Sequence, residues 1–126
     1  MTLVLDAGAL IALERNDRAM WRRFKAARLA GSVPVTHGGI VGQVWRAAGP
    51  RQALLAMALA GIDVRPLDDE LGRAAGALLA TTRTADVIDA ALVLLADDDD
   101  QIITSDPDDL EPLARVAGKH VDLITV

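Results

Sequence analysis

Carboxylates are the residues of this sequence best suited to chemistry. Asp6 follows the first apolar run of the chain, and Asp106 follows a late one. Asp86 and Asp89 stand three residues apart in a helical stretch, a spacing that puts both carboxylates on neighbouring parts of one helix face. No Lys or Arg lies in these motifs. We therefore expect a cation to join the acids, because uncompensated carboxylates repel one another and raise each other's pKa.

The ligand chemistry indicates which cation such a set would hold. Carboxylate oxygens are hard donors that suit Mg²⁺ or Mn²⁺, and Mg²⁺ usually binds one or two carboxylates together with waters and substrate phosphates. The pattern therefore predicts a phosphodiester or phosphoryl-transfer substrate. Helix capping is the alternative, because Asp is a favoured N-cap and would stabilise helices that begin after Asp6, Asp86 and Asp106.

Alternating strands and helices must bring these acids together. Short apolar runs predict strands at 2–5, 33–36, 62–65, 101–104 and 121–125, and helical patterns fill 7–13, 17–30, 39–48, 51–60, 68–80, 86–95 and 107–117. We expect a single three-layer α/β/α domain over residues 1–126, with a mainly parallel sheet of roughly five strands. Functional residues of open α/β sheets gather at the carboxyl ends of the strands, which is where Asp6 and Asp106 stand.

The amino-acid composition excludes several kinds of functional site. The 126 residues are 52% hydrophobic and include no cysteine, which excludes disulfides, thiolate metal sites and a cysteine nucleophile. Only two histidines are present, so a zinc site built on histidine is not expected. The first residues lack the basic lead of a secretory signal, and no apolar run approaches the roughly 20 residues that span a bilayer. We expect a cytoplasmic protein with no membrane partner.

Charge is divided unevenly along the chain. Residues 1–60 carry eight basic and three acidic side chains, whereas residues 61–126 carry five basic and fifteen acidic ones, for a net charge of −5. An acidic total disfavours nucleic-acid binding, which depends on Lys and Arg, but the early basic cluster weakens that inference. The cluster could follow an RNA backbone or form a solvated helix face; its members are Arg15, Arg18, Arg22, Arg23, Lys25 and Arg28. With 2% aromatic residues, a base-stacking platform is not encoded.

Four segments of the chain resemble the ordered motifs of a known family. They are Leu3-Val-Leu-Asp6-Ala-Gly-Ala-Leu-Ile-Ala-Leu, Val41-Gly-Gln43-Val-Trp-Arg46, Asp86-Val-Ile-Asp89-Ala-Ala and Thr104-Ser-Asp106-Pro-Asp-Asp-Leu110. In this order they resemble PIN-domain proteins and, among those, the VapC toxins of bacterial type II toxin–antitoxin systems. The resemblance extends over essentially the whole chain, and the order and spacing of the motifs are more specific than any one motif.

The resemblance implies a Mg²⁺-dependent endoribonuclease in which a metal-activated water cleaves RNA, with Mn²⁺ as a substitute metal. It assigns Asp6, Asp86 and Asp106 to the first, third and fourth acidic positions of the family. Asp89 matches an additional acid, so that these four carboxylates would form the metal site. Members of the family commonly form homodimers and are inhibited by a cognate antitoxin protein that blocks the acidic pocket.

The second acidic position departs from the family's pattern. A Glu is usual there, and this chain has Gln43, a catalytic candidate whose carbonyl can bind a hard cation but cannot act as a general base. We favour a weakened nuclease; the alternative is a catalytically silent module that binds RNA or antitoxin. Arg46 would lie on the same helix side as Gln43, where it could reach substrate or an Asp, or form a surface ion pair. Thr104 and Ser105 match a polar position that orients the site in the family.

Other residues are interpreted without a role in the site. A phosphoacceptor receiver domain is disfavoured, because no acidic pair adjoins the first strand and no Lys follows the late one. The acidic run 97–100 predicts a hydrated turn, and His37 is expected in a loop near a strand end. Helical settings predict that the large apolar residues lie in the core or in a dimer interface; these are Trp21, Phe24, Trp45 and Met57.

Overall fold

A five-stranded sheet forms the centre of the computed structural model, which describes residues 1–126. Its strands are β1 (Leu3–Leu5), β2 (Val35–His37), β3 (Asp63–Arg65), β4 (Gln101–Thr104) and β5 (Asp122–Thr125). All pairings are parallel, in the order β3-β2-β1-β4-β5. All three residues of β1 are buried, because helices cover this central strand on both faces. The predicted α/β class with a five-stranded parallel sheet is confirmed.

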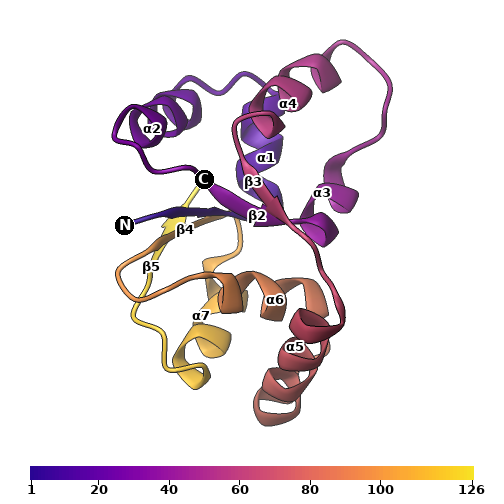
Figure 1. The fold of residues 1–126 in the computed structure, drawn as a ribbon, viewed down its shortest axis with the longest axis vertical. Coiled ribbons are helices and arrows are strands. Elements are labelled where there is room, and N and C mark those ends of the chain that lie inside the picture. Colours follow the sequence, from indigo (N-terminus) through magenta and orange to yellow (C-terminus); the bar gives the residue numbers. More distant parts are fainter.

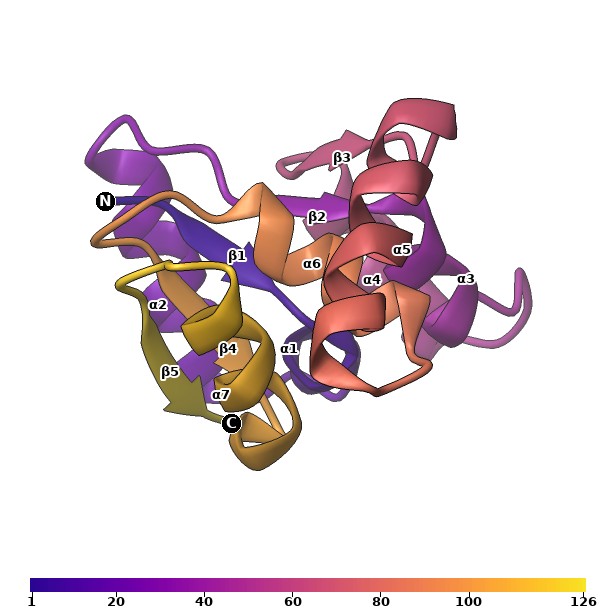
Figure 2. The ribbon, with the colours of Figure 1, turned by 90° about the horizontal axis from the view of Figure 1, so that it is seen from below.

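Helices cover both faces of this sheet (Figure 1). They are α1 (Ala7–Glu14), α2 (Arg18–Leu29), α3 (Gly38–Val44), α4 (Arg51–Leu59), α5 (Asp69–Thr82), α6 (Val87–Leu95) and α7 (Pro107–Val116). Helices α1, α2 and α4 lie on one face, and α5, α6 and α7 lie on the other, where Figure 2 shows them in front of the strands. Because each of the first four strands is followed by one or more helices that return the chain to the same end of the sheet, all five strands point the same way.

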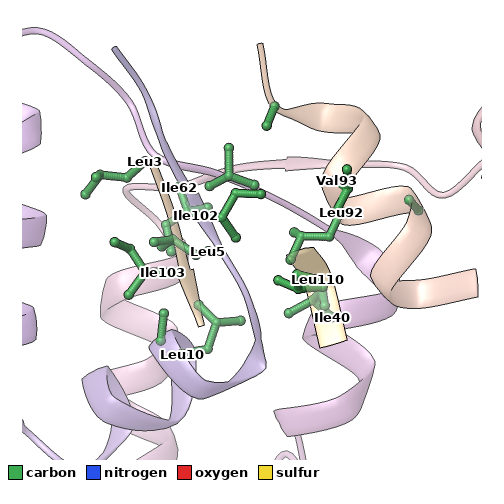
Figure 3. Packing of buried hydrophobic residues seen from close by; sticks show 14 of the residues in the cluster. Leu3, Leu5, Leu10, Ile40, Ile62, Leu92, Val93, Ile102, Ile103 and Leu110 are labelled. Atoms are coloured by element: carbon green, nitrogen blue, oxygen red, sulfur yellow. The ribbon is translucent and has the colours of Figure 1, made fainter. Parts of the chain in front are cut away.

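One apolar cluster of 25 buried residues holds the layers together. Figure 3 shows Leu92 of α6, Leu110 of α7 and Ile40 of α3 close together, with Leu5 and Ile102 along the two central strands. All five side chains are fully buried, and burial of each contributes roughly 1.5–3 kcal/mol. The core therefore holds α3 and α6, which carry Gln43 and Asp89, and α7, which begins after Asp106, against the two central strands.

The strand order reverses between β1 and β4. From β1 the chain moves outward through β2 to β3, then crosses to β4 on the other side of β1 and moves outward again to β5. Loops on the two sides of such a reversal leave a crevice at the carboxyl ends of the strands, and ligands of open α/β sheets bind there. Asp6 follows β1 directly, and Asp106 follows β4 after one residue.

The helix predicted over 39–48 is wrong at its end, because α3 stops at Val44. The Arg46 guanidinium donates hydrogen bonds to the carbonyl oxygens of Gly42, Gln43 and Trp45, at 2.7 to 3.2 Å, and so satisfies groups left free at the helix end. Ala47 then adopts a left-handed backbone conformation with φ of 60°, which turns the chain away from the helix. The strand predicted at 33–36 begins only at Val35.

Two side-chain predictions are corrected by burial. Asp100, expected in a hydrated turn, is only 7% exposed, and its carboxylate accepts hydrogen bonds from the backbone N–H groups of Thr2 and Asp97 at 2.8 and 2.9 Å. Trp45 and Met57 are not core residues, with 38% and 64% of their surfaces exposed. Their alternative place in a dimer interface remains a prediction. None of the helices, the longest being α5 with 14 residues, is both long and apolar enough to cross a bilayer.

Candidate functional site

Asp6 is the most deeply placed of the predicted site acids. It is 6% exposed and serves as the N-cap of α1. Its Oδ1 accepts a hydrogen bond of 2.7 Å from the N–H of Ala7, and its Oδ2 accepts one of 2.6 Å from the hydroxyl of Thr104. Hydrogen bonds to both oxygens fix the carboxylate and stabilise its charge. The capping role expected from the sequence is present, and it leaves Asp6 oriented at the switch point.

Thr104 connects the ends of the two central strands. Its hydroxyl is fully buried, donates to Asp6 and accepts a hydrogen bond of 3.0 Å from the N–H of Asp106. One side chain thus fixes a carboxylate after β1 and the backbone after β4. Ser105 is exposed, and its hydroxyl lies 3.4 Å from Oδ2 of Asp106, at the long limit of a hydrogen bond. Unlike Asp6, Asp106 makes no side-chain capping bond to its helix.

The two loops that carry these acids are in close contact. A Cβ atom placed on Gly8 would lie 2.6 Å from Oγ of Ser105 and 2.9 Å from its backbone nitrogen. Any larger residue at this position would push the β4–α7 loop away from the start of α1. Gly8 therefore permits the approach that brings Asp6 and Asp106 to one crevice.

The remaining predicted acids come from α6. Asp86 is its exposed N-cap and accepts a hydrogen bond of 3.1 Å from the N–H of Asp89. The pKa of Asp89 is raised to about 7, chiefly by partial burial and then by the negative charges of Asp86, Asp6, Asp109 and Asp106, in that order. Four carboxylates from three separate segments therefore act electrostatically on a fifth.

Asp109 is a member of this acidic group that sequence reasoning missed. It lies in the first turn of α7, and its N–H donates a 3.1 Å hydrogen bond to the carbonyl oxygen of Asp106. An acid in a first turn is ordinarily explained by the helix dipole alone. The available signal was its spacing of three residues from Asp106, which places both on one side of the helix start.

No basic side chain compensates the acidic group. The three ion pairs of the structure lie elsewhere, on exposed side chains, and join Arg65 to Asp63, Arg73 to Asp69, and Arg115 to Glu111. The oxygen donors match the preference of Mg²⁺ and Mn²⁺. No three acidic or histidine side chains, however, are arranged closely enough to hold a metal ion as they stand. Metal binding would require exposed carboxylates such as those of Asp86 and Asp106 to turn inward.

His37 was expected in a loop and is instead a fully buried link between α3 and α6. It ends β2 and caps α3, with Nδ1 accepting a 3.1 Å hydrogen bond from the N–H of Gly39. Its Nε2 lies 3.0 Å from the carbonyl oxygen of Ile88, so the hydrogen-bond pattern assigns the proton to Nε2. Burial lowers the pKa of His37, against opposing effects of the Ile88 hydrogen bond and the Asp6 charge. A neutral imidazole thus ties the helix of Gln43 to the helix of Asp89.

Gln43 and Arg46 are exposed and are not bonded to the acids. No hydrogen bond involves the side chain of Gln43, which lies on α3 near its carboxyl end. Arg46 contacts no Asp and forms no ion pair. Its guanidinium instead donates to three carbonyl oxygens, two in α3 and one on the residue that follows this helix. The structure thus unites Asp6, Thr104, Ser105 and Asp106 through contacts, and groups Asp86 and Asp89 with them by charge.

Comparison with known proteins leaves the family open. No protein-family model matches this chain, and no curated protein matches it. The resemblance to PIN domains therefore rests on four short motifs and on the place that the fold gives them.

Proposed function

We propose that this protein is a metal-dependent endoribonuclease whose site is the acidic group at the carboxyl ends of β1 and β4. The observation that supports this proposal is the uncompensated convergence of five carboxylates, four of which add to the effect of burial in raising the pKa of Asp89 to about 7. Structural ion-pair networks balance their charges, whereas a concentration of like charge at a switch point is typical of a site that takes up a cation.

Asp6, Asp86, Asp89 and Asp106 would hold Mg²⁺ or Mn²⁺. When bound, the metal would polarise the scissile phosphoryl group and promote ionisation of an attacking water. Thr104 keeps the Asp6 carboxylate oriented, and Asp109 adds negative charge to the group. Because the pKa of Asp89 is near neutrality, this carboxyl can lose its proton when a cation arrives.

The proposed metal favours a substrate that carries phosphate groups. A Mg²⁺ ion held by one or two carboxylates keeps positions for substrate phosphate oxygens, and RNA supplies phosphates along its whole length. The choice of RNA, inhibition by a cognate antitoxin and formation of a homodimer come from the resemblance to VapC toxins. They remain proposals.

A silent binding module is the second candidate. Gln43 carries no charge and contacts none of the acids. This position therefore lacks the negative charge with which a Glu would attract a metal ion. In that case the chain would bind RNA or antitoxin without cleaving. Measurable turnover by the wild-type protein would exclude this candidate.

Incubation of purified protein with total RNA tests the proposal. We expect cleavage in Mn²⁺ or Mg²⁺, no cleavage in EDTA, and a loss of about 100-fold or more in Asp6→Asn. Asp97→Asn is the matched control, because this exposed acid lies in the turn before β4, on the amino-terminal side of that strand. Intact RNA under every metal condition, or cleavage that survives both EDTA and Asp6→Asn, would refute the proposal.

A further inference from the structure

The surface of α2 carries an unusual concentration of unpaired positive charge. Five of its twelve residues are basic, and none of them forms an ion pair with a carboxylate. They are Arg18, Arg22, Arg23, Lys25 and Arg28. Like charges three or four residues apart destabilise a helix by roughly 0.2–0.5 kcal/mol per pair. This arrangement suits a surface that is neutralised by an anionic partner.

An apolar hollow of about 560 Å³ lies beside these cations, between α2 and α4. Trp21, Leu54 and Met57 provide its apolar lining, and the polar residues around them are Asn16, Arg18, Arg22 and Lys25. The indole N–H of Trp21 donates a 3.0 Å hydrogen bond to the carbonyl oxygen of Leu13, which fixes the ring. The ammonium group of Lys25 lies 5.9 Å from the centre of that ring. Apolar surface bordered by cations fits a ligand that has both flat apolar groups and anionic groups.

The basic surface also extends to the end of the sheet that carries the acidic group. Arg23 lines a smaller hollow together with Ile103, Thr125 and Val126. Thr125 is paired in register with Thr104, whose hydroxyl binds Asp6. A chain molecule lying along α2 would therefore be directed toward the carboxyl ends of β4 and β5.

We propose that α2 and its hollow bind single-stranded RNA, with phosphates on Arg18, Arg22 and Lys25 and one base in the hollow beside Trp21. Arg can grip phosphate through two donors, and stacking on an aromatic ring accepts any base. RNA is favoured over an acidic protein segment because its bases can stack on the Trp21 ring while its phosphates meet the cations, and because a bound RNA chain could continue to the acidic group. The inference rests on the proposed function for this continuity, and its binding test does not require cleavage.

Fluorescence anisotropy with a labelled single-stranded RNA of roughly 12 nucleotides, in EDTA, measures this binding without hydrolysis. The test variant is Arg18→Gln/Arg22→Gln/Lys25→Gln, and the matched control is Arg65→Gln/Arg73→Gln/Arg115→Gln, which removes the same charge from other elements. We expect at least tenfold weaker binding for the first and less than threefold for the second. The dependence of binding on salt should fall by about two in log–log slope, since each phosphate contact in a single strand contributes about 0.7.

A second measurement tests the place of the base. In Trp45→Phe, Trp21 is the only tryptophan, and RNA should quench its fluorescence. Unchanged fluorescence would overturn the base contact. The proposed RNA-binding role of the α2 surface would be overturned if both triple variants lost the same RNA affinity, or if folded wild-type protein did not bind RNA. If oligoglutamate binds as tightly as RNA and loses as much in the test variant, the surface recognises acidic protein and the inference is wrong.

The two proposals fail separately. RNA binding through α2 without cleavage in any metal would refute the nuclease and leave this inference in place. The reverse result would be cleavage that requires Mn²⁺ and Asp6, with an α2 triple variant that binds RNA as tightly as the wild type. That result would support the nuclease and refute RNA binding by α2. Circular dichroism of each triple variant checks that it is folded, and folding is expected because all six substituted side chains are exposed.

Discussion

The hydroxyl of Thr104 donates a 2.6 Å hydrogen bond to the carboxylate of Asp6, across 98 residues of sequence. The same oxygen accepts from the N–H of Asp106, so Thr104 connects two site segments at once. Thr104 is fully buried, so its hydroxyl is bonded to these two protein groups and not to solvent.

Thr104→Val should lower the free energy of unfolding by about 2 kcal/mol, because a buried charged acceptor and a backbone donor each lose a partner. Urea denaturation measures the change. Thr104→Ser keeps the hydroxyl and should recover most of the cleavage that the Val variant loses. Equal activity in the Val and Ser variants would show that the hydroxyl does not orient Asp6.

The raised pKa of Asp89 predicts a pH dependence of stability. With a pKa of about 7 in the folded state and 3.8 as the ordinary value, the folded protein holds more protons than the unfolded chain between these pH values. Stability contributed by this group is therefore present at low pH and is lost as the pH rises through that window. Asp89→Asn should be more stable than wild type at pH 8 and by a smaller margin at pH 5.

The size of that difference is limited by solvent, because the carboxyl group is only half-buried. We expect about 1–2 kcal/mol at pH 8, measured by urea denaturation at both pH values. Asp97→Asn, at an exposed position, should show no such pH dependence. A wild-type curve parallel to that of Asp89→Asn from pH 5 to 8 would contradict the prediction.

Gln43→Glu should add one negative charge on α3, the helix that we expect to contribute to the proposed metal site. We expect Mn²⁺-dependent cleavage to rise by about tenfold, since ligand charge strongly controls affinity for such cations. Gln101→Glu makes the same charge change at the start of β4, at the opposite end of the sheet, and should leave cleavage unchanged. A gain from an undetectable wild-type baseline would instead support the silent module, and an unchanged rate would show that α3 does not contribute to the site.

His37 should remain neutral near pH 7, with its proton on Nε2. Burial lowers its pKa, and its Nδ1 already accepts the hydrogen bond from Gly39 that caps α3. Long-range proton–nitrogen NMR spectra at pH 7 and pH 6 should show an unprotonated Nδ1 at both values. A proton on Nδ1 at pH 7, or a charged ring at pH 6, would disprove this hydrogen-bond assignment.

Asp100→Ala should destabilise the protein by about 2 kcal/mol, because two backbone N–H groups lose a charged acceptor. Asp97→Ala removes an exposed carboxylate that makes no side-chain hydrogen bond and should change stability by less than about 0.5 kcal/mol. Thermal unfolding compares the two. Cleavage, scored per folded molecule, should be unaffected in both, and equal stabilities would contradict the structural role of Asp100.

The sequence was most informative where local pattern and tertiary role coincide. The strand at 101–104 was predicted with its observed bounds, since its apolar residues are bounded by an acidic turn and by a Ser-Asp-Pro helix start. Asp6 and Asp106 were placed at strand ends for the same reason. Parallel alternation then brought them to one edge, as the fold confirms.

The residues that were missed depend on contacts between distant segments. Asp109 acts on Asp89 only because α7 packs beside α6, and His37 is buried only because α6 covers it. The end of α3 was missed because Arg46, a good helix former, uses its side chain to cap the preceding turn. In the sequence, Asp100 is one of four consecutive acids that predict a hydrated turn. Its partner Thr2 lies 98 residues away and is brought to it only by the fold.

Pairing of β1 with β4 also sets the time at which the acidic group can exist. Asp6 is made before its partners Thr104, Asp106 and Asp109, which follow about a hundred residues later. At a synthesis rate of roughly 5–20 residues per second, the ribosome works for several seconds on a chain that holds Asp6 without its partners. A nascent chain of this protein therefore carries no assembled carboxylate group while it is being translated through residue 103, and the chemistry proposed for it begins only after β4 and the start of α7 have been made.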